Sequence, residues 1–181
     1  MQNRAEPRKP DPGDPATLYV GLGSNLGERR AHLRRALKQL ARTFGGPIGL
    51  SRVYETAAWG VADQPDYLNM VAAYRSTLAP LAVLATLQRM ETAAGRVRHR
   101  RWGSRTLDLD LLSYGHHRLA TPTLTLPHPR IAERRFVLAP LAELAPALIL
   151  PGQQYNIGEL LTRCTDPLAV RPVAGVEESN T

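Results

Sequence analysis

Residues 106–114 constrain the fold of this chain most strongly, because leucine and aspartate alternate along them. Successive side chains of a β-strand point to opposite faces of a sheet. A strand here would place Asp108 and Asp110 on one face and the leucines between and around them on the other. With a rise of about 3.3 Å per residue, the two carboxylates would lie roughly 6–7 Å apart. The pattern therefore predicts a sheet with one apolar face and one face that carries paired acids.

The paired acids are candidate metal ligands. Two carboxylates on one face repel each other unless a cation lies between them, and donor sets made only of oxygen favour hard ions such as Mg²⁺. Arg98, Arg101 and Arg105 lie just upstream. Metal-binding acids beside phosphate-binding arginines are typical of nucleotide phosphoryl transfer. The alternative is a half-buried strand whose two acids pair with nearby arginines.

Positive charge is concentrated in one part of the sequence. The formal net charge is +7, and residues 89–135, with ten arginines and four acids, carry +6 of it. Guanidinium groups pair bidentately with phosphate oxygens, so such a cluster indicates a polyphosphate or nucleic-acid partner. A solvated basic face is the alternative.

Length and composition exclude several classes of protein. A chain of 181 residues with 43% hydrophobic residues can bury the core of one domain, which argues against native disorder. Its apolar runs are far shorter than the roughly 18 residues that a membrane span needs. The single cysteine, Cys164, cannot form an internal disulfide or a cysteine-based zinc site. We therefore expect a soluble, cytoplasmic protein.

The predicted domain covers residues 17–171, between a disordered leader (1–16) with four prolines and a disordered tail (172–181). Hydrophobic spacing predicts, in order, a strand over 17–23, a helix over 28–44, strands over 48–56 and 67–76, a helix over 80–95 and a strand over 106–114. Further helical segments are expected near 136–143 and 157–164. This order, β-α-β-β-α-β, predicts an α+β ferredoxin-like fold, an antiparallel sheet with helices packed on it and C-terminal additions.

The glycine-rich residues 21–27 do not match a known nucleotide motif. No Lys-Ser/Thr pair follows, as a P-loop requires, and Leu26 occupies the third glycine position of the dinucleotide fingerprint. A turn between strand and helix explains the glycines. Ser24 and Asn25, at the end of the strand, could still line a site.

Several side chains could bind a planar ligand. Aromatic faces that flank a cleft suit a purine or a pterin, although each ring alone could equally be core packing. Asn69 shares a strand face with Tyr67 and can offer a donor and an acceptor to a ring edge. His128, between two prolines, is either a presented imidazole or a satisfied turn residue. The aromatic candidates are Trp59, Tyr67, Trp102 and Phe136.

Short motifs occur in a specific order along the chain: Gly-Ser-Asn at 23–25, Asp-Gln-Pro-Asp-Tyr-Leu-Asn at 63–69, Gly-Arg-Val-Arg at 95–98, Arg-Trp-Gly at 101–103 leading to Asp110, and Pro-His-Pro at 127–129. Together, over about residues 18–164, they resemble the family of 6-hydroxymethyl-7,8-dihydropterin pyrophosphokinases of folate biosynthesis. The resemblance implies a ferredoxin-like fold, two Mg²⁺ ions, and transfer of the pyrophosphoryl group of ATP to the pterin hydroxymethyl with release of AMP.

The resemblance also implies roles for individual residues. Asp108 and Asp110 would hold both metal ions, and the hydroxymethyl oxygen would attack the β-phosphorus in line. The catalytic residues would be Arg96, Arg105, Asp108 and Asp110. ATP would contact Leu84, Gln88, Glu91, Arg98, Trp102, Leu111, His128 and Arg134. The pterin would contact Thr56, Ala57, Ala58, Trp59, Tyr67, Asn69 and Phe136.

We expect the protein to be a monomer whose partners are two small-molecule substrates, ATP and 6-hydroxymethyl-7,8-dihydropterin. Neither nucleic acid nor a membrane is an expected partner. An RNA-binding module is the main rival, since the topology and the arginines allow it. However, the aromatic pattern expected on its central strands is missing, and Asp108 and Asp110 would repel a phosphate backbone without a metal. A metal-dependent nucleotidyl transferase with another acceptor is the second rival.

Overall fold

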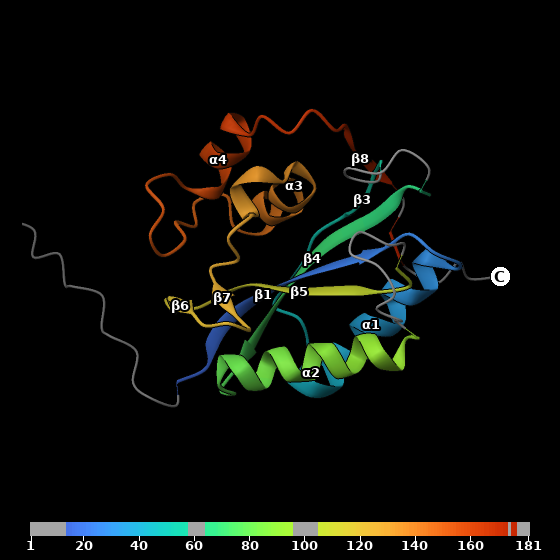
Figure 1. Cartoon of the computed structure of the whole chain (residues 1–181), viewed down its shortest axis with the longest axis horizontal. Coiled ribbons are helices and arrows are strands. Elements are labelled where there is room, and N and C mark those ends of the chain that lie inside the picture. The colour runs from blue at the N-terminus through green and yellow to red at the C-terminus, as the bar shows by residue number, and fades with distance from the viewer. Residues whose placement is uncertain (1–13, 58–63, 96–104, 174, 177–181) are drawn as a thin grey trace, which may run out of the picture.

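The structure, a computed structural model, describes residues 14–57, 64–95, 105–173 and 175–176. Its helices and strands lie in three layers, with the sheet in the middle (Figure 1). In chain order they are β1 (Ala16–Ser24), α1 (Arg29–Phe44), β2 (Gly49–Leu50), β3 (Val53–Thr56), β4 (Tyr67–Ser76), α2 (Pro80–Ala93), β5 (Asp108–Tyr114), β6 (Leu119–Ala120), β7 (Thr125–Leu126), the 3-10 helix η1 (Ile131–Glu133), α3 (Arg135–Leu144), α4 (Ile157–Arg163) and β8 (Val170–Val173).

The main sheet has the strand order β5-β1-β4-β3-β8, with β2 also paired to β4. Strand β1 is an inner strand and pairs antiparallel with both β4 and β5. The inner order β5-β1-β4-β3, with α1 and α2 as the two connecting helices, is that of a ferredoxin-like fold. The α+β ferredoxin-like prediction is therefore confirmed.

The two faces of the sheet are covered by different helices. Helices α1 and α2 pack on one face, and α3 and α4 pack on the other (Figure 1). The alternation predicted for β5 is confirmed, because Leu109 and Leu111 are buried in the core with α1 and α2, whereas Asp108 and Asp110 are only half-buried. The acids therefore face the side of the sheet on which α3 packs.

Local sequence explains where the helices begin and end. Pro80 occupies the start of α2, where the missing N–H costs no helical hydrogen bond. Gly45 follows α1 with a φ of +83°, a conformation that L-residues rarely adopt. Helix α4 begins with a capping box, in which the Asn156 side chain accepts from Glu159 N and the Glu159 carboxylate accepts from Asn156 N, each at 2.9 Å.

The single strand predicted over residues 48–56 is wrong in detail, because the chain forms two short strands there. Ser51 separates β2 from β3, and its hydroxyl accepts from Val71 N at 2.9 Å, so a side chain replaces a backbone acceptor of the ladder. Ser51 N still donates to Val71 O at 3.0 Å, which keeps both strands on β4.

The predicted boundary between the domain and its C-terminal tail, at residue 172, also needs correction. Strand β8 crosses it and pairs antiparallel with β3, with Pro172 opposite Tyr54 and Val173 opposite Val53. Beyond β8, Gly175 O accepts from the Arg30 guanidinium of α1 at 2.7 Å.

Two smaller differences concern strands. Strand β1 begins at Ala16, one residue before the predicted start at residue 17. The hairpin of β6 and β7 was not predicted, since strands of two residues carry no periodicity.

Among the described helices, none combines the length and the apolar character that crossing a membrane requires.

We expect Leu87→Ala to lower the free energy of unfolding by about 2–5 kcal/mol, because Leu87 is 0% exposed between α2 and the sheet. Urea denaturation measures this loss. The control is Leu81→Ala on the same helix, where the side chain is 50% exposed and the change should stay within about 0.5 kcal/mol. Equal losses for the two variants would contradict the described packing of α2.

Candidate active site

A cavity of about 220 Å³ lies on the side of the sheet opposite α1 and α2. Its floor is formed by β1, β3, β4 and β5. Side chains that come just before and just after η1, and others at the start of α3, complete its lining. The register fixes the floor: Gly23 of β1 pairs with Asn69 on one side and Asp108 on the other, and Gly21 pairs with Val71 and Asp110. The floor therefore has an acid end on β5 and an amide end on β4, separated by glycines.

Because Gly23 has no side chain, nothing at this position of β1 separates the acid end of the floor from its amide end. A Cβ atom at this position would lie 3.1 Å from Asn69 Oδ1, which is tight, and 3.8 Å from Asp108 Cβ, which is ordinary contact, so a side chain would displace the Asn69 amide. Adjacent strands lie about 4.8 Å apart, which puts Asn69 and Asp108 roughly 10 Å from each other across β1. One elongated ligand, or two ligands in contact, can span that distance.

The acid end combines a carboxylate pair with a cation. Arg105 Nη1 contacts Asp108 Oδ2 at 2.5 Å. Burial alone would lower the pKa of Arg105, but the Asp108 carboxylate, together with Tyr67 and Asp110, raises this pKa above its ordinary value. The alternative in which the acids pair with arginine is thus realised for Asp108, and it does not remove the acids from the cavity, which both of them line.

The donor set at the acid end fits Mg²⁺ that arrives with phosphate. The described residues contain no group of three or more His, Cys, Asp or Glu side chains that could hold a metal ion. Mg²⁺ is commonly bound by one or two carboxylates together with substrate phosphates and water, so a pair of aspartates suffices. Asp108 and Asp110 are therefore suited to a metal ion that is shared with a ligand.

His128 lies beside the acid end as a neutral imidazole. Its backbone N donates to Leu112 O at 2.8 Å, which fixes it next to β5, and its Nδ1 accepts from Arg130 N at 3.2 Å. Burial, followed by the positive charges of Arg134 and Arg130, lowers the pKa of His128 to about 4. With Nδ1 as an acceptor, the proton sits on Nε2, which is a hydrogen-bond donor at neutral pH.

Arg134 brings an unsatisfied donor to the cavity. Its Nε is buried and has no hydrogen-bond partner among the described residues, and its guanidinium lies 5.6 Å from the centre of the Phe136 ring. Burial lowers the pKa of Arg134, yet a guanidinium stays charged at physiological pH. A buried donor without an acceptor costs about 1–3 kcal/mol, which an anionic ligand would recover. Arg105, His128 and Arg134 together make this end suited to phosphate.

The amide end is suited to a planar polar ring. Asn69 is 8% exposed, and its Nδ2 donates to Thr56 Oγ1 at 2.9 Å, which holds the amide in one orientation with Oδ1 over Gly23. Tyr67 and Phe136 also line the cavity. A ring between these side chains would meet aromatic surface and a fixed donor-acceptor group at once.

The structure brings most of the described candidates around this one cavity. Those that line it are Thr56, Ala57, Tyr67, Asn69, Arg105, Asp108, Asp110, His128, Arg134 and Phe136. Arg96, Arg98, Trp102, Ala58 and Trp59 lie outside the described residues. All the roles assigned to these side chains stay predictions.

Leu84, Gln88, Glu91 and Leu111, predicted as ATP contacts, do not line the cavity. Leu111 points to the face of the sheet on which α2 packs, as the alternation requires. Glu91 is buried, and its Oε1 accepts from Leu109 N at 2.8 Å. This bond ties the end of α2 to the strand residue between the two aspartates.

Some lining residues were missed by the sequence reasoning, although a signal existed for several of them. Leu112 has the same parity as Asp108 and Asp110 on β5, and Val71 the same parity as Asn69 on β4, so alternation alone could have assigned both. Val137 lies on α3 next to Phe136, and no pattern in the sequence indicated that it would line the cavity. Ser24 and Asn25 are close to the site but do not line it.

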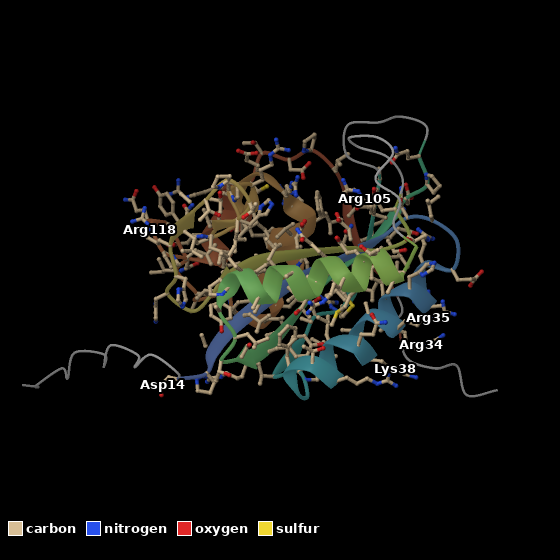
Figure 2. The ribbon with its side chains drawn as sticks, turned by 60° about the horizontal axis from the view of Figure 1, so that its bottom comes forward. Asp14, Arg34, Arg35, Lys38, Arg105 and Arg118 are labelled. Atoms are coloured by element: carbon tan, nitrogen blue, oxygen red, sulfur yellow. The ribbon has the colours of Figure 1, made fainter. Side chains whose placement is uncertain are left out.

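The basic window of the sequence is divided in space. Figure 2 shows Arg105 and Arg118 far apart on the molecule, although both belong to residues 89–135. Arg135 serves the fold instead, since it donates to Cys164 O at 2.6 Å and to Asp166 O at 3.2 Å. The net charge of the window therefore overstates the charge at the cavity.

The comparisons of this sequence with known protein families and known proteins agree on one family. A protein-family model described as "7,8-dihydro-6-hydroxymethylpterin-pyrophosphokinase (HPPK)" matches residues 19–146. The 2-amino-4-hydroxy-6-hydroxymethyldihydropteridine pyrophosphokinase of Haemophilus influenzae is 44% identical over 151 residues, which are 83% of this chain and 94% of that protein. The enzyme of the same name from Pseudomonas aeruginosa is 44% identical over 161 residues, 88% of this chain and 94% of that protein.

Solved structures support the fold. A crystal structure of a triple mutant of Plasmodium falciparum HPPK-DHPS matches with a TM-score of 0.68 at 13% identity. The match covers 82% of this chain and 43% of that chain, so this chain spans less than half the length of that solved protein. At this identity the likeness concerns the fold alone.

We expect His128 to titrate with a pKa of about 4, well below its ordinary value of 6.5. Between these two values the unfolded chain takes up a proton at this residue and the folded chain does not, so stability should fall as the pH drops from about 6.5 to about 4. NMR titration of the imidazole measures the pKa directly. Arg134→Gln should raise it by removing one of the repelling charges. A wild-type midpoint near 6.5 would show that the imidazole is not buried as described.

Proposed function

Because the chain belongs to the 7,8-dihydro-6-hydroxymethylpterin pyrophosphokinase family, we propose that it transfers a pyrophosphoryl group from ATP to the hydroxymethyl group of 6-hydroxymethyl-7,8-dihydropterin. The products are AMP and the pterin diphosphate, a step of folate biosynthesis. One observation carries the proposal: a single cavity is lined by a carboxylate pair and two guanidinium groups and, across a glycine, by a fixed amide, together with two aromatic side chains.

The pterin occupies the amide end in this proposal. A pterin ring carries donors and acceptors along one edge, and the Asn69 amide, held by Thr56, can satisfy a matching pair. Phe136 and Tyr67, which both line the cavity, offer aromatic faces for stacking. In this orientation the hydroxymethyl group is directed along the floor toward Asp108 and Asp110.

The triphosphate of ATP occupies the acid end. Arg105 and Arg134 supply positive charge, and His128, as a neutral donor, adds a hydrogen bond without a further charge. Arg134 Nε gains the acceptor that it lacks among the described residues. Because these groups are partly buried and fixed by the fold, they stabilise developing phosphate charge with little reorganisation.

Asp108 and Asp110 would hold the two Mg²⁺ ions of this proposal. When bound, Mg²⁺ neutralises phosphate charge and polarises the phosphorus that is attacked. Arg105, which pairs with Asp108, holds that carboxylate in one orientation. The Glu91 bond to Leu109 N holds the strand between the two aspartates in place.

The transfer itself is a direct displacement. The hydroxymethyl oxygen attacks the β-phosphorus in line and forms the new O–P bond. The bond from the β-phosphorus to the oxygen that bridges it to the α-phosphorus breaks, and AMP leaves with the electron pair. The hydroxyl proton is released to solvent. The protein supplies position and charge, and no covalent bond to a side chain is formed.

The experiment that tests this function is an AMP-release assay with ATP and Mg²⁺, run with and without 6-hydroxymethyl-7,8-dihydropterin. We expect AMP to form only when the pterin is present, in equal amounts with the pterin diphosphate, which mass spectrometry identifies. Pyrophosphate release that does not need the pterin would instead favour a nucleotidyl transferase with another acceptor.

We expect Asp108→Asn and Asp110→Asn each to lower kcat by about 100-fold or more, because each removes a charge on which phosphate and metal binding depend. Steady-state kinetics measure the loss, and a thermal melt shows that the fold is kept. Glu133→Gln, at an exposed acid outside the cavity lining, is the matched control and should leave kcat within about two-fold. Wild-type turnover in either aspartate variant would rule out the assigned metal ligands.

A further inference from the structure

Two residues that line the cavity at the start of α3 flank one residue that does not. Arg134 and Phe136 both line it, and Arg135 lies between them in the sequence. The backbone changes from extended to helical at this point, since Arg134 has a φ of −121° and a ψ of 102° and α3 begins at Arg135. The directions of the two lining side chains therefore depend on how the backbone of Arg135 is held.

The start of α3 is capped from a distant part of the chain. Arg134, the residue before the helix, makes no side-chain hydrogen bond to the first turn. The first N–H groups of a helix have no partner within the helix, and an N–H that is withdrawn from water needs an acceptor. Arg135 N donates to Asp166 Oδ2 at 3.0 Å, and Asp166 lies 31 residues further along the chain. The Asp166 carboxylate therefore caps α3, at the end where the helix dipole favours negative charge.

The Asp166 carboxylate is itself held in place. Asp166 is 7% exposed, and its second carboxylate oxygen, Oδ1, accepts from Leu168 N at 3.1 Å. The Arg135 side chain returns to the same segment, because its Nε donates to Asp166 O at 3.2 Å and its Nη2 to Cys164 O at 2.6 Å. The segment at residues 164–166 thus holds Arg135 through both its backbone and its side chain.

We propose that Asp166 is a positioning residue that fixes Arg134 and Phe136 in the cavity, an inference that rests on the proposed function. Asp166 does not line the cavity, so it acts through the peptide group of Arg135. In the proposed function, Arg134 contacts the phosphates and Phe136 contacts the pterin ring. Loss of the cap lets this turn change conformation and moves both side chains from the geometry that the substrates require. A displacement of about 1 Å can lower a rate by about 100-fold.

Positioning and stability give different kinetic results. A variant that only unfolds more easily contains less active enzyme, which lowers the apparent kcat but leaves the KM of the folded molecules unchanged. A variant that misplaces Arg134 and Phe136 has weaker substrate contacts in every folded molecule, which raises KM. The KM for the pterin is therefore the measurement that separates a positioning role of Asp166 from a purely structural one.

Steady-state AMP-release kinetics on the full chain test the proposal, with ATP, Mg²⁺ and 6-hydroxymethyl-7,8-dihydropterin as substrates. We expect Asp166→Ala to raise the KM for the pterin about 5-fold or more and to lower kcat/KM about 20-fold or more. The assay is run at a temperature at which a thermal melt shows that the variant is folded. A pterin KM within about two-fold of the wild-type value in the folded variant would overturn the proposal.

Glu159→Ala is the matched control, because the Glu159 carboxylate makes the same kind of contact at the start of another C-terminal helix. Its Oε2 accepts from Asn156 N at 2.9 Å at the start of α4, which packs against α3. Neither residue of this contact lines the cavity. We expect the pterin KM of Glu159→Ala to stay within about two-fold of the wild-type value. Equal increases in the two variants would mean general loosening of the C-terminal part and would overturn the specific role of Asp166.

A measurement on the wild-type chain covers the case in which Asp166→Ala does not fold. A contact that improves substrate binding is itself stabilised when the substrate binds, by linkage. The probes are 6-hydroxymethyl-7,8-dihydropterin and Mg²⁺ with α,β-methylene-ATP, whose bridging carbon blocks transfer. Together they should slow hydrogen exchange of the Arg135 N–H about 3-fold or more, and that of the Asn156 N–H by less than about two-fold. Unchanged exchange at Arg135, or equal slowing at both sites, would overturn the proposal.

Failure of this inference can be told apart from failure of the proposed function. If the wild type releases no AMP when the pterin is present, the proposed function itself fails, and that result appears before any variant is made. If the wild type turns over and the pterin KM of folded Asp166→Ala is unchanged, only the role of Asp166 fails.

Discussion

The inner strand β1 must present an apolar face to the core and an open face to the cavity, and the rest of the site depends on this combination. One face of β1 carries Leu18, Val20 and Leu22, which are buried against α1 and α2 and help to hold the layers together. The opposite face carries Gly21 and Gly23, where side chains would fill the cavity. Period-two alternation makes both possible in one strand. The apolar face anchors the sheet, so the bare face can remain open without loss of the core.

The sheet on either side of β1 then places unlike chemistries at a fixed distance. Antiparallel pairing sets Asp108 and Asn69 opposite the same glycine, so their separation follows from strand spacing alone. The cations that balance the acids come from elsewhere: Arg105 precedes β5, and Arg134 precedes α3. The neutral donor His128 also precedes α3. Since α3 belongs to the C-terminal additions, the ferredoxin-like core alone supplies the acids and the amide but only part of the charge that phosphate requires. This division explains why the additions pack over the cavity.

Sequence reasoning reached those features that depend on local periodicity. The alternation of leucine and aspartate assigned Asp108 and Asp110 to one face of a strand, and the structure confirms that placement. It could not find contacts that depend on distant segments. The amide of Asn25 meets Arg105 and Pro65, which are 80 and 40 residues away, and the strand β8 is stabilised by pairing with β3 rather than by its own composition. Ser51, likewise, divides a predicted strand through a hydroxyl that bonds to β4.

The positions of the charged side chains also could not be predicted from the sequence. The sequence places ten arginines in residues 89–135, but their order along the chain does not show which of them lie on the same surface. Arg135 holds the C-terminal segment through backbone oxygens, Arg118 lies far from Arg105 (Figure 2), and Arg134 alone of the three keeps a buried donor without a described partner. A few well-placed guanidinium groups in a partly buried cavity act more strongly on phosphate than a larger number on an open surface, because water screens them less. A cavity of about 220 Å³ offers room for a small ligand, which agrees with the small-molecule substrates of the proposed function.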